Sequence, residues 1–255
     1  MDIPREELLE FLEFKYMQYN QPGFIEHDPV SIPHLFHKKQ DIEIAGFLTA
    51  TISWGNRKSI LASARKLMLM MDDDPHRFVL DASRHDLGPL RTFVHRTFNG
   101  SDCIFFVTSL KRIYRSHTSM EELFADLNTA GAGNAISEFR KSFLARHRDV
   151  HAGKHLADPL RGSSAKRINM FLRWMVRRDG RGVDFGLWNR ISPSALICPL
   201  DVHTGNSARR LGLLKRRQND WKAALELTES LRSFDPEDPV KYDFALFGPG
   251  AMEKF

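Results

Sequence analysis

Residues 158–178 read DPLRGSSAKRINMFLRWMVRR. A turn around Gly162 leads into a predicted helix from Ser164 to Arg178. In that helix Arg173 lies on the same face as Lys166, because seven positions make about two turns, and the apolar residues share the opposite face. The sequence therefore predicts an amphipathic helix whose cationic face begins at a lysine.

Lys166 stands in the first turn of this predicted helix. Free backbone N–H groups at a helix N-terminus favour a bound anion such as a phosphate. The positive end of the helix dipole, together with Arg167 and Arg173, disfavours the ammonium and so favours the neutral amine, which is a nucleophile. The alternative is an ordinary amphipathic helix with a solvated cationic face.

A second segment, PLDVHTGNSARRLGLL at residues 199–214, places Asp201 directly before another predicted helix. An aspartate at this position commonly caps the helix by accepting a bond from a backbone N–H group. Capping would also hold the carboxylate rigidly, so the same residue is a candidate for catalysis.

Apolar residues recur at helical spacing along most of the chain, and strand-like alternation is scarce. The fold class predicted is all-α, with helices expected at 86–98 and 102–115 among others. The chain of 255 residues contains two cysteines, which excludes a disulfide scaffold and four-cysteine zinc or iron–sulfur sites.

The positive charge is concentrated in one part of the chain. The net charge is +5 overall, whereas residues 161–217 carry thirteen bases and three acids. Such a block indicates either a polyanion site or a solvated helical surface. The longest uncharged run, residues 44–56, is too short to cross a bilayer, and the N-terminus lacks the order of a signal peptide. We expect a cytoplasmic protein without a membrane partner.

The two segments resemble signatures of the helix-hairpin-helix DNA glycosylase superfamily. Leu160, Gly162, Lys166 and Asn169 match the pattern L-P-G-V-G-x-K and the helix after it, and LDVH at 200–203 matches V-D-T-H. The 35 positions from Lys166 to Asp201 resemble the archaeal 8-oxoguanine glycosylase branch. RINMFLRWMVRRDG and VDFGLW are also similar to a bacterial family of unassigned activity within the superfamily.

This resemblance implies a single domain over residues 1–255 with two helical subdomains and the hairpin at the cleft between them. One subdomain would cover 42–178, and the other 1–41 plus 179–255. The implied function is base-excision repair by a DNA glycosylase with AP-lyase activity. It would remove an oxidised base, with 8-oxoguanine as the foremost candidate, and would act at the bacterial nucleoid. Lys166 would be the nucleophile and Asp201 would stabilise the sugar charge, with no cofactor.

The partner implied is duplex DNA with a damaged or abasic nucleotide, bound by a monomer. The residues expected to contact DNA are Arg161, Gly162, Ser163, Ser164, Arg167, Arg173, Asn56 and His203. Three aromatic side chains, Trp54, Trp174 and Trp188, are candidates for stacking on an extruded base. The alternative for each tryptophan is a place in the core.

Two rival hypotheses remain open at the level of sequence. His147, His151 and His155 recur every four residues and would suit a metal, but the pattern shows no carboxylate ligand, so we predict no metal site. The second rival is a nucleic-acid-binding protein that keeps the fold without the chemistry, and its partner would be either DNA or RNA.

Overall fold

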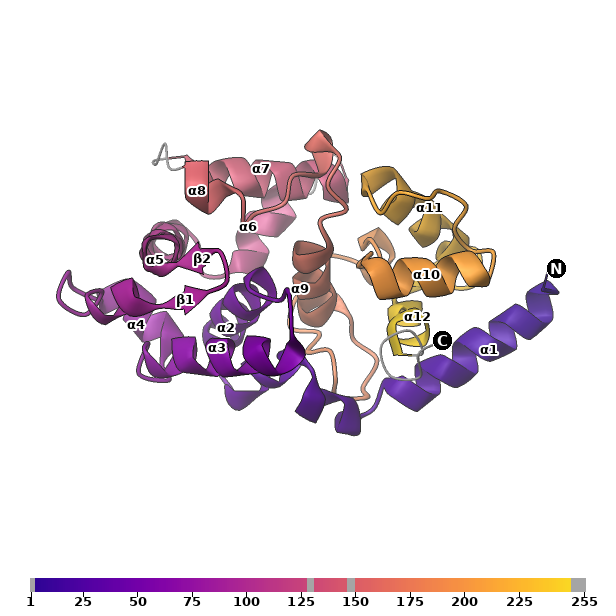
Figure 1. Cartoon of the computed structure of the whole chain (residues 1–255), viewed down its shortest axis with the longest axis horizontal. Coiled ribbons are helices and arrows are strands. Elements are labelled where there is room, and N and C mark those ends of the chain that lie inside the picture. The colour runs from indigo at the N-terminus through magenta and orange to yellow at the C-terminus, as the bar shows by residue number, and fades with distance from the viewer. Residues whose placement is uncertain (1–2, 128–130, 146–149, 249–255) are drawn as a thin grey trace. The chain divides into compact units, whose positions relative to one another are not determined.

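The computed structural model describes residues 3–127, 131–145 and 150–248, and helices dominate them, as the all-α prediction required (Figure 1). None of these helices is both long enough and apolar enough to cross a membrane. In chain order the α-helices are α1 (Arg5–Tyr19), α2 (Lys39–Thr51), α3 (Arg57–Leu69), α4 (Pro75–Asp81), α5 (Gly100–Ser116), α6 (Met120–Leu127), α7 (Ala132–Leu144), α8 (Val150–Gly153), α9 (Lys166–Val176), α10 (Val202–Arg210), α11 (Trp221–Arg232) and α12 (Asp243–Gly248).

The chain forms two compact units, which are described separately below. The central unit consists of residues 27–130 and 134–157, and the terminal unit contains the described parts of 1–26, 131–133 and 158–255. The subdomains expected from the sequence divide elsewhere, after residues 41 and 178. In the structure α9 belongs with the C-terminal helices, because its side chains pack against groups that follow it in the chain. Lys166 and Asp201 therefore belong to the same unit.

Phenylalanines fill the core of the central unit. The ring of Phe47 lies 5.9 Å from that of Phe106 and 5.6 Å from that of Phe139, between centroids. All three side chains are buried. Aromatic pairs at such separations add stabilisation beyond the area they bury, so this cluster holds α2, α5 and α7 together.

The helix expected at residues 86–98 is wrong. The chain instead forms a 3₁₀ turn, Pro89–Thr92, followed by a short antiparallel hairpin of β1 (Val94–His95) and β2 (Phe98–Asn99). Gly100 at the start of α5 explains part of this path. A Cβ there would lie 2.2 Å from the carbonyl oxygen of Arg91, so only glycine permits the chain to pass so closely.

In the terminal unit α9 is buried over most of its length, while α1 packs against α12 (Figure 1). Trp174 and Trp188 are 0% and 1% exposed, and the Trp188 ring meets Phe171 edge-on at 5.5 Å. The prediction that these two tryptophans line a base pocket is therefore wrong. They belong to the core because the segment after α9 lies against it: the N–H groups of Phe185 and Trp188 donate to the carbonyls of Trp174 and Met175.

The cationic face of α9 is also buried, against carboxylates. Arg173 donates to Asp184 at 3.2 Å and to Asp243 at 2.5 Å, and only 4% of this residue is exposed. Arg177, with no exposed surface, donates to Asp184 at 2.5 Å and to Asp179 and Asp238 at 2.9 Å. Arg173 cannot contact DNA as predicted, because its guanidinium is already held by two acidic groups inside the protein.

We expect Arg177→Leu to lower the free energy of unfolding by about 3–5 kcal/mol, because it leaves a buried carboxylate without its cation. Urea denaturation, monitored by tryptophan fluorescence, measures the change in the free energy of unfolding. Arg217→Leu removes an exposed arginine from the same unit and should stay within about 0.5 kcal/mol of wild type. Equal stability of the two variants would show that the ionic cluster is dispensable.

Candidate active site

The structure brings Lys166 and Asp201 together. The Nζ atom of Lys166 lies 3.7 Å from Oδ2 of Asp201, and the two side chains are 25% and 24% exposed. Both groups are therefore partly open to solvent. The ammonium also lies 3.5 Å from the sulfur of Met170, one helical turn further along α9.

The turn before α9 is tied to two other elements, and this fixes the lysine. The hydroxyl of Ser164 donates to the carbonyl of Leu200 at 3.2 Å, directly before Asp201. The carbonyl of Gly162 accepts from the N–H of Trp221 at 3.1 Å. Ala165 adopts a left-handed conformation with φ of 52°, which costs on the order of 1 kcal/mol in a residue other than glycine. The chain thus turns sharply into α9 immediately before Lys166.

Asp201 is the N-cap of α10, the structural role considered for it from the sequence. Its Oδ1 atom accepts from the N–H of Thr204 at 3.0 Å, and Oδ2 is the atom that faces Lys166. The amide of Asn219 donates to the carbonyl of Asp201 at 3.0 Å. One oxygen of the carboxylate is thus engaged by the backbone, while the other is available to the lysine.

A third carboxyl group lies buried behind this pair. Asp243, at the start of α12, accepts from Arg173 and lies 3.9 Å from the sulfur of Cys198. Burial raises its pKa to about 6, with Arg173 opposing the shift and the Asp201 carboxylate adding to it. Burial also raises the pKa of Cys198 well above its usual value, which makes this thiol a poor nucleophile.

The other residues predicted to contact DNA differ in their surroundings. Arg161 and His203 are exposed, and Arg167 is half-buried. The N–H groups of Gly162 and Ser163 donate to the carbonyls of Pro159 and Asp158 within the turn. These two donors are therefore engaged inside the protein and are not presented to a phosphate.

Asn56 and Trp54 belong to the central unit. Asn56 caps α3 by accepting from the N–H of Ser59, and the half-buried Trp54 ring stacks on His155 at 5.7 Å. Their proposed contacts with DNA stay predictions. His147 of the histidine series lies outside the described residues, whereas His151 and His155 come together with Asp102 in a group that suits a metal ion.

Comparison with known proteins identifies the family and corrects the resemblance. The model of the DUF2400 family, described as proteins of unknown function, matches residues 28–252, and the chain belongs to this family. No curated protein and no solved structure matches. Assignment to the helix-hairpin-helix glycosylase superfamily is wrong, since the matching family is a different one. The resemblance rested on short motifs, and the hairpin expected at this turn is not confirmed: α9 is preceded by a 3₁₀ turn, Pro159–Arg161.

Asp243 was not among the site residues predicted from the sequence. The local signal for it is an aspartate at the head of an apolar stretch, DFALFG, where burial on all sides demands a partner for the carboxylate. That partner, Arg173, lies seventy positions earlier in the chain. Residue spacing alone does not connect two such distant positions.

We expect Asp243→Asn to change how stability depends on pH. The raised pKa means that the folded protein holds this proton more tightly than the unfolded chain. Wild type should therefore lose up to about 3 kcal/mol of stability from this group as pH rises from 4 to 7, a loss absent from the variant. Urea denaturation at unit pH intervals measures the difference between the two proteins.

Asp220→Asn serves as the control for this measurement. Hydrogen bonds from Arg216 and from the N–H of Ala223 lower the pKa of Asp220 to about 2, so it titrates below the window. Its stability curve should run parallel to that of wild type. A parallel curve for Asp243→Asn as well would refute the raised pKa.

Proposed function

We propose that the protein excises damaged bases from DNA, with the amine of Lys166 as nucleophile and Asp201 as its charged partner. The observation that carries this proposal is the partly exposed pair of Lys166 Nζ and Asp201 Oδ2, 3.7 Å apart. An amine positioned beside a fixed carboxylate is suited to attack at a sugar or carbonyl carbon.

The reaction needs the amine in its neutral form. Asp201 accepts a proton from the ammonium and passes it to the departing base as Lys166 attacks C1′ of the deoxyribose, so the carboxylate is ionised again when charge develops on the sugar. The new C1′–N bond replaces the bond to the base, which leaves with the electron pair and takes up a proton. Cleavage of the C1′–O4′ bond opens the sugar ring, with a proton passing from the lysine nitrogen to O4′, and leaves an imine on the lysine. Loss of a C2′ proton to solvent then expels the 3′ phosphate and nicks the strand. The charge that develops on the sugar lies next to Oδ2 of Asp201.

The rigidity of Asp201 supports this role. Its Oδ1 is bonded to Thr204 N–H, and its backbone carbonyl accepts from Asn219. A carboxylate whose orientation is set before the substrate arrives stabilises charge without reorganisation, which is the main electrostatic source of catalysis. Lys166 is positioned by the turn that Ser164 ties to Leu200. The two groups are thus held from neighbouring positions in the same unit.

Exposed cations of the terminal unit supply the attraction for a polyanion. Burial of Arg173 and Arg177 removes two positive charges from the surface that the sequence alone suggested. The lysines and arginines of the 161–217 block that are exposed are Arg161, Arg178, Arg190, Arg210, Lys215 and Arg217. Phosphate contacts from such side chains would position DNA without reading its sequence.

We expect borohydride to trap wild-type protein covalently on oligonucleotides that contain 8-oxoguanine or an abasic site, because reduction converts the imine into a stable amine. Lys166→Gln should abolish the adduct while circular dichroism and melting temperature stay close to wild type. Lys222→Gln is the matched control, since it removes an exposed lysine of the same unit that lies outside the 161–217 block, and it should trap like wild type. Denaturing gel electrophoresis measures the adduct.

Persistence of the adduct in Lys166→Gln would remove this lysine from the chemistry. DNA binding without any adduct, across a panel of oxidised, alkylated and abasic substrates, would instead identify a binding protein that lacks the activity.

We expect Asp201→Asn to reduce the single-turnover rate of base excision by a factor of about 100 or more, the usual contribution of a positioned acid–base group. Asparagine also caps helices well, so the melting temperature should change little. Rapid-quench assays on the substrate that wild type accepts measure the rate. An unchanged rate would leave Asp201 with its capping role alone.

A further inference from the structure

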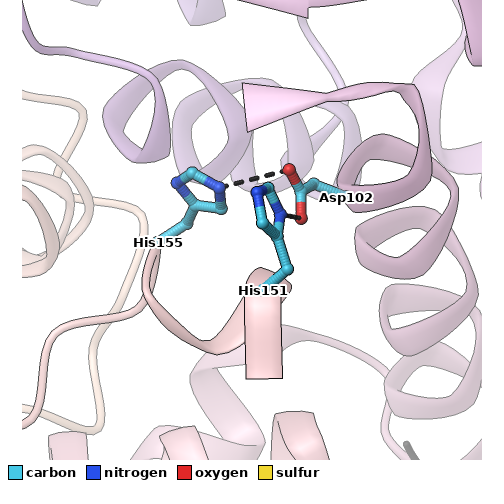
Figure 2. A group of neighbouring side chains, drawn as sticks. All are labelled: Asp102, His151 and His155. Atoms are coloured by element: carbon cyan, nitrogen blue, oxygen red, sulfur yellow. Dashed lines mark hydrogen bonds and ion pairs between the residues drawn. The ribbon is translucent and has the colours of Figure 1, made fainter. Parts of the chain in front are cut away.

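Three side chains of the central unit converge on one point (Figure 2). Asp102 comes from the first turn of α5, His151 from α8 and His155 from the segment just after α8. Each offers one ligand atom, and these atoms lie within 4.8 Å of one another. The grouping joins residues about fifty positions apart in the chain.

The carboxylate of Asp102 is buried and accepts bonds from three directions. Its side chain has no exposed surface. Oδ1 lies 2.7 Å from Nδ1 of His151, and Oδ2 lies 3.2 Å from Nε2 of His155 (Figure 2). Oδ2 also accepts from the N–H of Asn99 at 2.9 Å, as part of the capping box of α5. Both imidazoles therefore direct a nitrogen at an oxygen that the helix start already orients.

The two histidines differ in how tightly their side chains are held. The side chain of His155 is 3% exposed and is fixed between aromatic rings, with Trp54 stacked on it at 5.7 Å and Phe98 edge-on at 5.0 Å. His151 is 42% exposed, and its Nε2 accepts from Lys154 at 2.6 Å, which leaves Nδ1 toward Asp102. The site thus combines two rigid groups with one that can adjust to a ligand.

We propose that Asp102, His151 and His155 bind one divalent transition-metal ion of the zinc class. Two imidazoles and a carboxylate are the donor set of open zinc sites, in which water completes the coordination. Ligand atoms around tetrahedral zinc lie about 3.4 Å apart, given bonds of about 2.0–2.1 Å. The imidazole nitrogens lie 2.7 and 3.2 Å from the carboxylate oxygens they face, and the three ligand atoms lie within 4.8 Å of one another. A shift of the exposed His151 side chain would bring them to the spacing of a zinc site. The ion takes the place of the protons that the imidazoles donate to Asp102, and each proton moves to the other nitrogen of its ring.

The surroundings of Asp102 match what metal ligands need beyond the first contacts. A ligating carboxylate is commonly held by a further hydrogen bond that fixes its direction, and Asn99 N–H supplies one here. The bound ion ties α8 to the start of α5, so its binding energy adds to the stability of the central unit. This site is independent of the proposed function, because Lys166 and Asp201 belong to the terminal unit.

The test uses the full chain without a histidine tag, stripped with EDTA and titrated with Zn²⁺ in a calorimeter. We expect one Zn²⁺ per chain, a rise in melting temperature on binding, and visible absorption bands when Co²⁺ replaces Zn²⁺. His151→Ala, which removes an exposed ligand and little packing, should weaken zinc binding on the order of 100-fold. The matched control is His85→Ala, an exposed histidine of the same unit, which should bind like wild type.

Asp102→Asn gives a second variant, in which the amide oxygen still accepts from Asn99 but the charge is lost. It should bind zinc as weakly as His151→Ala, and if circular dichroism shows that it does not fold, His151→Ala alone decides. Equal affinities for His151→Ala and His85→Ala would overturn the proposal, as would the absence of stoichiometric binding in wild type. The three residues would then be a hydrogen-bonded clasp and no more.

Discussion

The guanidinium of Arg177 is enclosed by the carboxylates of Asp179, Asp184 and Asp238, and the terminal unit depends on that arrangement. A charge without exposed surface is tolerated only when opposite charges and hydrogen bonds replace the lost water. Asp179 also accepts from Tyr16 and Asn20, so the same cluster reaches α1. The C-terminal end of α9 is therefore anchored from several directions.

The anchored C-terminal end of α9 limits how far its N-terminal end, which carries Lys166, can move. Arg173 links the cluster to Asp243, and the charges of Asp201 and Lys166 in turn shift the pKa of Asp243 in opposite directions. A rigid helix carries the position of its C-terminus to its first residue, which is Lys166. The lysine therefore projects from a helix that has little freedom to shift, and this is the condition that a preorganised active site requires.

Local pattern was enough to predict the features that depend on neighbouring residues. The helical spacing after Gly162 predicted α9, and the aspartate before VHTGNSARR predicted the cap of α10. The pair of Lys166 and Asp201 was expected only through the family resemblance, and the structure places the two side chains next to each other although the family assignment is wrong.

Contacts between residues far apart in the chain could not be predicted from the sequence. Helical spacing placed Arg173 on a cationic face, and no residue near it in the chain indicates that Asp243 is its partner. The histidine spacing suggested a metal, but its carboxylate, Asp102, lies about fifty positions earlier and reads locally as part of a helix start. Trp174 satisfies the pattern of both a core residue and a stacking platform, and only the segments that cover α9 distinguish the two.

The connection between α10 and α11 has a consequence for how this chain tolerates change. Surface connections usually accept insertions, because lengthening a loop costs little entropy. This one ends at Trp221, whose N–H is bonded to Gly162, while Ser163 pairs with Asp220. Arg209 further crosses the loop to the carbonyls of Arg216 and Arg217. Extra residues here would displace the turn that leads into α9. The length of this loop therefore determines where the amine of Lys166 lies.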